Sequence, residues 1–194
     1  DGIFETMKVV HKKIALEALH FERFFSGLAS MGFKVPALIT AGRMREQVLA
    51  LCERNKCDSL ARVRLSVFRG NGGIFESLDN FQYCIECWPL NASIGQLNEN
   101  GLVIDIFPDA WKSCDRFSNL KSANYLPYAM AARYAKENKL NECLVLNVHE
   151  RIADATIANI FLIKGDRLIT PSLNEGCVNG VMRRYLIANI KVEE

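Results

Sequence analysis

The hydrophobic pattern of the first hundred residues changes between a strand-like and a helix-like period. Alternating and three- or four-residue spacings predict a hairpin at 3–16 with a polar turn at 11–13, helices at 18–31 and 40–54, and strands at 61–67 and 80–88. Gly32 is expected to end the first helix, and Thr40 to cap the second. Between the two last strands, residues 69–73 are rich in glycine and are expected to form a flexible loop.

The second half of the chain has a weaker pattern. It predicts a helix at 127–138 and strands at 143–147, 159–164 and 168–170, the last two joined by a turn at 164–167. Residues 107–119 show no clear period. We therefore expect a small N-terminal domain at 1–107, a linker at 108–119 and a second domain at 120–194.

Composition excludes several classes of partner. With 24 basic and 22 acidic residues among 194, the net charge of +2 gives no broad electrostatic footprint for nucleic acid or a membrane surface. No apolar run is long enough to span a membrane, and the start does not resemble a signal peptide. The 7 scattered cysteines are typical of free thiols. These features favour a cytoplasmic protein.

One cysteine pair has the spacing of a metal or redox site. Cys84 and Cys87 are separated by two residues, but they lie in an alternating, strand-like run. Positions three apart on a strand point to opposite faces. The spacing therefore does not predict a zinc site, and no second pair follows it.

Lys121 is the candidate for nucleophilic chemistry. It is the only charged residue in 118–125, and its nearest charged neighbours are Asp115 and Arg116. A lysine in such a place is either a helix-start residue that reaches into water or a nucleophile with a lowered pKa. Taken alone, its surroundings favour the first interpretation.

Two downstream segments favour the second interpretation. Asp154 lies between short apolar runs, as expected of a buried acid, and residues 174–184 form a glycine-punctuated loop that leads into an amphipathic helix. Helix starts of this kind bind anions, because free backbone N–H groups point at the ligand. A nucleophilic lysine, a buried acid and a phosphate cup are the three parts that pyridoxal phosphate needs.

The order of these motifs resembles the class-IV aminotransferase family, the fold-type-IV pyridoxal-phosphate enzymes. Four segments spread over nearly the whole chain carry the resemblance: Asp1–Thr6, His20–Arg23, Lys121 and Gly180–Arg183. It implies an α+β fold of two domains, a small α/β N-terminal domain and a larger β-rich C-terminal domain, with pyridoxal 5'-phosphate as cofactor. The family normally extends beyond both outer motifs, so both ends look truncated unless this is an unusually compact member.

The resemblance assigns the cofactor-binding residues. Lys121 matches the lysine that forms the Schiff base and then acts as general base. Arg23 matches the arginine that holds the phosphate, and the backbone N–H groups of Val181 and Met182 match those that cap it. Asp154 stands where the family usually has glutamate. Its shorter side chain is expected to make a longer or water-bridged contact to the pyridine nitrogen.

Further residues have a functional and a structural interpretation. Asn124 and Thr156 are expected to hydrogen-bond the cofactor or neighbouring side chains. Without the resemblance, Arg23 would be a surface arginine whose stem covers the aromatics of its helix. His20 is expected to be a core or supporting histidine rather than a catalytic one.

The resemblance also places two arginines near the substrate carboxylates, Arg64 and Arg69. From the strand pattern alone, Arg64 would be an exposed-face residue, and Arg69 would lie in the loop beyond the strand. Tyr125 and Tyr128 are expected to be helix-packing aromatics. A small amine that carries carboxylates is therefore the implied substrate.

Three functions remain open at this stage. The glycine loop, the arginine-bearing strand and residues 178–183 favour 4-amino-4-deoxychorismate lyase, which releases 4-aminobenzoate and pyruvate for folate biosynthesis. A branched-chain or D-amino-acid aminotransferase is the alternative. A degenerate, non-catalytic homologue is the third, since Asp154 replaces the usual glutamate.

We expect the protein to be a homodimer, as relatives of this fold are. The helix around Phe21, Phe24 and Phe25 is expected to offer apolar surface beyond what one core needs.

Overall fold

The computed structural model describes residues 1–70 and 81–194, so most of the predicted glycine loop lies outside the described residues. The chain forms two compact units. The first contains residues 1–97 and 121–124, and the second contains residues 98–120 and 125–194. This division differs from the boundaries expected from the sequence.

Backbone hydrogen bonds explain why residues 121–124 join the first unit. Phe4 N donates to Lys121 O at 3.0 Å, and Ala123 N donates to Gly2 O at 2.8 Å. The segment therefore runs beside the first strand, although it follows a long stretch of the second unit in sequence.

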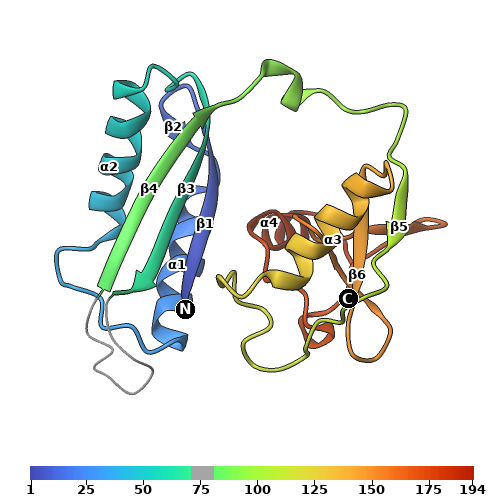
Figure 1. Ribbon diagram of the computed structural model, residues 1–194. Coiled ribbons are helices and arrows are strands. Elements are labelled where there is room, and N and C mark those ends of the chain that lie inside the picture. The colour runs from blue at the N-terminus through green and yellow to red at the C-terminus, as the bar shows by residue number, and fades with distance from the viewer. Residues whose placement is uncertain (71–80) are drawn as a thin grey trace. The chain divides into compact units, whose positions relative to one another are not determined.

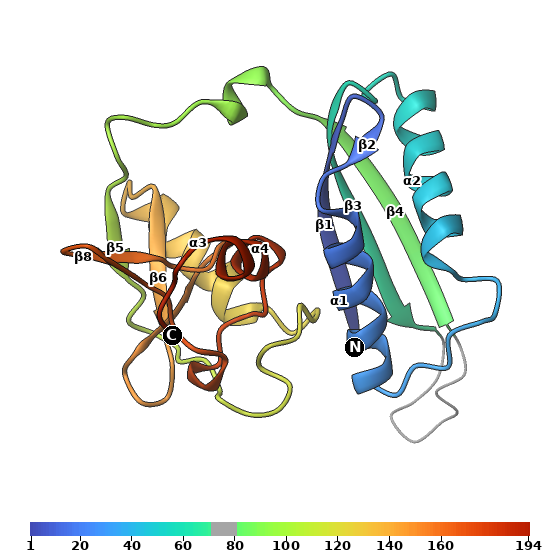
Figure 2. The ribbon, with the colours of Figure 1, turned by 180° about the vertical axis from the view of Figure 1, so that it is seen from behind.

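The first unit is an antiparallel sheet covered on one face by two helices. Its elements are β1 (Gly2–Val10), β2 (Lys13–Ile14), α1 (Glu17–Ser30), α2 (Ala41–Arg54), β3 (Leu60–Arg69), β4 (Phe81–Pro89) and the short η1 (Ala92–Gly95). The strand order is β2-β1-β3-β4. Figure 1 and, from behind, Figure 2 show α1 and α2 on the same face of this sheet. Alternate side chains of β1 and β3 fill the core beneath them.

Local signals explain these elements, and the predicted hairpin, two helices and two following strands are confirmed. His11 and Lys12 have φ of 46° and 61°, as a two-residue hairpin turn requires. The side chain of Thr40 accepts a hydrogen bond from Arg43 N and caps α2. Gly32, with φ of 70°, follows the end of α1.

The second unit has smaller sheets. Its elements are β5 (Ile104–Ile106), α3 (Leu126–Glu137), β6 (Glu142–Leu146), β7 (Ile152–Ala155), β8 (Leu162–Lys164), β9 (Arg167–Ile169), η2 (Leu173–Glu175) and α4 (Val181–Asn189). Strand β6 pairs in parallel with β5 and antiparallel with β7. Helix α3 packs on β6 over a small core. Gly165, with φ of 63°, closes the predicted β8–β9 turn.

Two strands of this unit were not predicted. Strand β5 has three exposed residues and forms only by pairing with β6. Strand β7 was recognised as apolar runs around an acid but not as a strand. Among the helices of the described ranges, none combines the length and apolar character needed to cross a bilayer.

Candidate functional site

A buried carboxylate of β1 holds two side chains of α1 in the first unit. Glu5 lies on the core face of β1 with Ile3 and Met7, and it is 2% exposed. Arg23 donates from Nε to Glu5 Oε1 at 2.7 Å and from Nη2 to Oε2 at 2.6 Å, the fork-like pairing of a guanidinium with a carboxylate. His20 Nδ1 lies 2.7 Å from the same Oε2.

These contacts keep Glu5 ionised. Burial alone raises the pKa of Glu5, but the hydrogen bonds and charges of His20 and Arg23 outweigh it and hold that pKa below its usual value. The Arg23 side chain is only 11% exposed, so the interpretation of Arg23 as a surface arginine is wrong. His20 supports a neighbouring carboxylate.

Lys121 and Arg64 meet at the ring of Phe4. Lys121 Nζ lies 4.6 Å from the ring centroid, and Arg64 Cζ lies 4.2 Å from it. Both distances are within the range of a cation–π contact. Arg64 Nε also donates to Ser66 Oγ at 3.1 Å. Within the first unit, two residues predicted for the site therefore share one aromatic neighbour.

Arg69 is engaged elsewhere. It ends β3 rather than lying in the loop beyond, which corrects the sequence-based placement. Its Nε donates to Asp1 Oδ2 at 3.0 Å, its Nη2 donates to Met31 O at 2.5 Å, and its Cζ lies 4.2 Å from the centroid of the Phe33 ring. It lies five positions after Arg64 along the strand, a rise of about 17 Å. The two arginines are therefore too far apart along β3 to grip one small carboxylate together.

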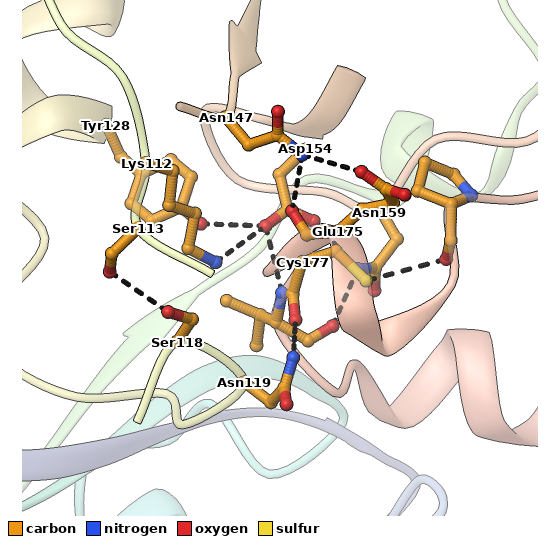
Figure 3. Close-up of polar contacts among 12 residues, drawn as sticks. Lys112, Ser113, Ser118, Asn119, Tyr128, Asn147, Asp154, Asn159, Glu175 and Cys177 are labelled. Atoms are coloured by element: carbon orange, nitrogen blue, oxygen red, sulfur yellow. Dashed lines mark hydrogen bonds and ion pairs between the residues drawn. The ribbon is translucent and has the colours of Figure 1, made fainter. Parts of the chain in front are cut away.

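The second unit holds a buried carboxylate in different surroundings. Asp154, on β7, is 2% exposed and stands at the centre of the contacts drawn in Figure 3. Its Oδ2 accepts hydrogen bonds from Lys112 Nζ at 3.2 Å, Tyr128 Oη at 2.7 Å and Val178 N at 2.9 Å. Its Oδ1 accepts one from Asn159 Nδ2 at 2.8 Å. Tyr128 thus has a polar role beyond the packing expected of it.

The charges of this cluster are only partly compensated. Burial raises the pKa of Asp154, and the opposing effects of Lys112, Tyr128 and the Val178 N–H are smaller. Burial likewise lowers the pKa of Lys112 more than the nearby carboxylate raises it. A further positive charge beside Asp154 would favour its ionised form.

Three asparagines hold the loop that leads to α4 (Figure 3). Asn119 Nδ2 donates to the carbonyl oxygens of Leu173 and Cys177 at 2.8 and 2.7 Å. Asn147 Nδ2 donates to Glu175 Oε2 at 2.7 Å. Asn159 Nδ2 donates to Asp154, as noted above, and also to the carbonyl oxygen of Val178 at 2.8 Å. This loop and the acid are therefore one hydrogen-bonded assembly.

The start of α4 is packed against that assembly. A Cβ on Gly180 would lie 1.8 Å from Asn159 Oδ1, so a larger residue at this position would displace the Asn159 amide from its hydrogen bonds. Within the described residues, no side chain caps the helix. The N–H groups of Val181 and Met182 therefore belong to an uncapped first turn, where anions bind. Their role as phosphate ligands stays a prediction.

The remaining predicted residues have weaker geometric support. Thr156 N donates to Glu142 Oε1 at 3.2 Å, and the Thr156 residue is half-buried. Asn124 is exposed. Tyr125 precedes α3 and is 39% exposed, so the expectation that it packs as a helix aromatic is wrong.

The aromatic helix does not provide the apolar surface expected of it. Phe21 and Phe24 are 4% and 1% exposed, and both lie in the core between the helices and the sheet. Phe25 is partly buried against the same core. The prediction that this helix offers an apolar dimer surface is therefore wrong. The expectation of a homodimer then has only the family resemblance to support it.

Sequence reasoning missed Glu5, Lys112 and Asn159. Glu5 lies inside the recognised motif Asp1–Thr6, and Asn159 lies five residues after Asp154. Their partners, however, are distant in sequence. The one signal for Glu5 in the sequence was its place in the alternating strand pattern, where it shares a face with the apolar Ile3 and Met7.

Comparison with known proteins identifies the family. The sequence matches the model of amino-transferase class IV over residues 2–194. It is 28% identical over 194 residues to aminodeoxychorismate lyase of Bacillus subtilis (strain 168), covering 98% of this chain and 64% of that protein. The chain thus spans less than two thirds of that relative's length.

Solved structures share the fold. The 4-amino-4-deoxychorismate lyase of Pseudomonas aeruginosa superposes with a TM-score of 0.81 at 22% identity, over 99% of this chain and 72% of that one. The branched-chain amino acid aminotransferase of Escherichia coli gives a TM-score of 0.82 at 19% identity, over 100% of this chain and 66% of that one. The predicted α+β fold of the fold-type-IV enzymes is confirmed. The chain belongs to the class-IV aminotransferase family, whose enzymes depend on pyridoxal phosphate.

Proposed function

We propose that this protein is a pyridoxal-phosphate enzyme that acts as a 4-amino-4-deoxychorismate lyase. The observation that carries the assignment of the cofactor is the buried Asp154 with its hydrogen-bonded loop, because an acid in this state suits a protonated pyridine nitrogen. Among the described residues, Oδ1 of Asp154 accepts one hydrogen bond, from Asn159, whereas Oδ2 accepts three, so Oδ1 is the oxygen proposed to accept a hydrogen bond from the ring N–H.

The phosphate-binding groups also fit. A guanidinium has five N–H donors, and Arg23 gives the Nε and Nη2 side of its fork to Glu5. That pairing fixes the orientation of the guanidinium that is proposed to hold the phosphate. The uncapped N–H groups of Val181 and Met182 supply neutral anion donors. Thr156 and Asn124 are proposed to complete the hydrogen bonding of the cofactor.

The cofactor supplies an electron sink for a carbanion next to the substrate nitrogen. Lys121 is proposed to hold the cofactor through its Nζ and, once freed, to move the proton at the substrate carbon. Asp154 keeps a positive charge at the ring nitrogen. Arg64, which shares the Phe4 ring with Lys121, is proposed to bind a substrate carboxylate.

The lyase is favoured over amino transfer by the identity to the Bacillus subtilis enzyme. Aminodeoxychorismate carries two carboxylates, which suits a cationic substrate site. A branched-chain aminotransferase is the alternative, supported by the fold shared with the Escherichia coli enzyme.

Product analysis separates the two reactions. The pyridoxal-phosphate-loaded protein is incubated with aminodeoxychorismate and no keto acid. The lyase releases pyruvate and 4-aminobenzoate over many turnovers, since no amino acceptor is needed. Brisk amino transfer from valine to a keto acid, with no pyruvate from aminodeoxychorismate, would contradict the lyase. Protein that takes up no cofactor would contradict both enzymes and support the non-catalytic homologue.

We also propose that the working form is a homodimer. Light scattering across the concentrations used for activity measures the mass directly. A fully active monomer would contradict this proposal.

A further inference from the structure

The C-terminal turn of α2 places two thiols side by side. Lys56 has φ of 56°, Cys57 N donates to Cys52 O at 3.0 Å, and Lys56 N donates to Glu53 O at 3.0 Å. This is the Schellman pattern, which brings the side chains at the two outer positions together. Cys52 and Cys57 occupy those positions and are 0% and 3% exposed.

Strand β4 adds a third thiol. Cys87 Sγ lies 3.8 Å from Cys57 Sγ, and the sulfur atoms of these two residues and Cys52 all lie within 4.8 Å of one another. Cys84, three residues before Cys87, is exposed, while Cys87 packs toward the core. The predicted opposite orientation of this pair is therefore confirmed. The partners of Cys87 come from earlier in the chain.

The fold does not need thiols at these positions. Helix α3 ends in the same pattern, with Lys139 at φ of 57° and Leu140 N donating to Ala135 O at 2.8 Å. There an alanine and a leucine form the outer pair. A plain apolar pair is thus enough to close such a turn, and three converging thiols at the end of α2 are a chemical feature in addition to packing.

We propose that Cys52, Cys57 and Cys87 form a binding site for a soft metal ion, best suited to Cu(I). Thiolates select soft ions. Three sulfur atoms about 2.3 Å from one ion lie about 4 Å apart in a planar triangle. The 3.8 Å between the sulfur atoms of Cys57 and Cys87 already matches that spacing.

The number of donors favours Cu(I) over zinc. Within the described ranges, the group of potential ligands holds three cysteines and no further histidine, cysteine or carboxylate. Structural zinc takes four ligands, whereas Cu(I) is stable with three thiolates.

Two of the three thiols are held in their protonated form in the metal-free protein. Burial raises the pKa of Cys52 to about 12, and it also raises the pKa of Cys87. Protonated, buried thiols are poor nucleophiles, which argues against a catalytic or exchanging pair. A bound metal displaces the thiol protons, and the ion would then join the end of α2 to the edge strand β4.

The test is a Cu(I) titration of the reduced, full chain under nitrogen. A chromophoric Cu(I) chelator, bicinchoninate, competes for the ion. The wild type is expected to retain about one Cu(I) per chain. Cys57→Ser and Cys87→Ser should each weaken retention about tenfold or more, with an unchanged circular dichroism spectrum. Cys87 is only half-buried, so Cys87→Ser still tests the proposal if Cys57→Ser does not fold.

Cys84→Ser is the matched control, because it removes an exposed thiol from the same strand. It should retain Cu(I) as the wild type does. Equal loss of Cu(I) in Cys84→Ser and Cys87→Ser would overturn the proposal. Release of all Cu(I) from the wild type to the chelator would also overturn it. That conclusion would hold even if mild oxidation then joined Cys57 and Cys87 in a disulfide.

Discussion

The two buried carboxylates of this protein differ in how their burial is compensated. Glu5 and Asp154 are each 2% exposed, yet the pKa of Glu5 lies below its usual value and that of Asp154 lies above it. Glu5 receives two hydrogen bonds at 2.6 and 2.7 Å from one guanidinium and a contact of 2.7 Å to a histidine. Asp154 has a longer ion pair, 3.2 Å to Lys112, and otherwise neutral donors.

The difference indicates different roles. A fully compensated carboxylate fixes its partner, so Glu5 acts as a positioning residue for Arg23. An under-compensated one responds to a new charge, so Asp154 is suited to a cationic ring nitrogen. Arg23 and Lys112 are the matching cations, and their geometry accounts for the contrast: a planar fork pairs with two carboxylate oxygens, whereas an ammonium contacts one.

The largest expected effect is on turnover. Asp154→Asn should lower turnover about a hundredfold or more, the scale of one positioned ionisable group, while cofactor stays bound through Lys121 and Arg23. Asp154→Glu should keep more activity but lose about 1–3 kcal/mol of stability, because the site is closely packed. Turnover and cofactor content are measured on the same samples. Equal activity of Asp154→Asn and the wild type would remove this residue from the mechanism.

The second effect is on folding. Glu5→Gln should lower the free energy of unfolding by about 3–5 kcal/mol, because it leaves the Arg23 charge buried without its partner. Urea denaturation measures this. Glu46→Gln, at an exposed position of α2, is the control and should stay within about 0.5 kcal/mol of the wild type. If Glu5→Gln lost no more free energy of unfolding than Glu46→Gln, the proposed difference between the two carboxylates would be contradicted.

The pH dependence of stability should have opposite signs at the two sites. The pKa of Glu5 in the folded protein is lowered. The wild type should therefore be more stable than Glu5→Gln above about pH 4.5, and this difference should vanish as the pH falls through the folded pKa. The folded pKa of Asp154 is raised, so wild type should lose stability relative to Asp154→Asn as the pH rises through it. Urea titrations of cofactor-free protein from acid to neutral pH test this. Slopes of the same sign would contradict the assignment.

A smaller effect is expected at Tyr128. Tyr128→Phe removes one neutral hydrogen bond to Asp154 and should cost about 0.5–1.5 kcal/mol of stability. Tyr134→Phe, on the same helix, is the control, because that ring packs on Phe107. Thermal unfolding of both variants measures the difference. Equal shifts would show that the hydroxyl of Tyr128 contributes nothing specific.

Features with a local cause were predictable from the sequence. The turn at His11, the cap at Thr40 and the glycine turn at Gly165 each depend on a few adjacent residues. The order of short motifs was enough to indicate the family and the fold.

Features assembled from distant residues were not predictable. Lys112 reaches Asp154 across 42 residues of sequence, and Cys57 meets Cys87 across 30. Strand β5 is exposed and has no periodic signal of its own. Arg23 was assigned to phosphate by motif, but the buried carboxylate that orients it was invisible because its partners lie on another element.

The most direct test of the account identifies the lysine that holds the cofactor. The loaded protein is reduced with borohydride, digested and analysed by mass spectrometry. Lys112 is an internal comparison, since it is a buried lysine whose pKa is lowered by burial. The reduced cofactor is expected on Lys121 alone, and Lys121→Ala is expected to carry none. Attachment to Lys112, or cofactor fixed equally well in Lys121→Ala, would contradict this expectation.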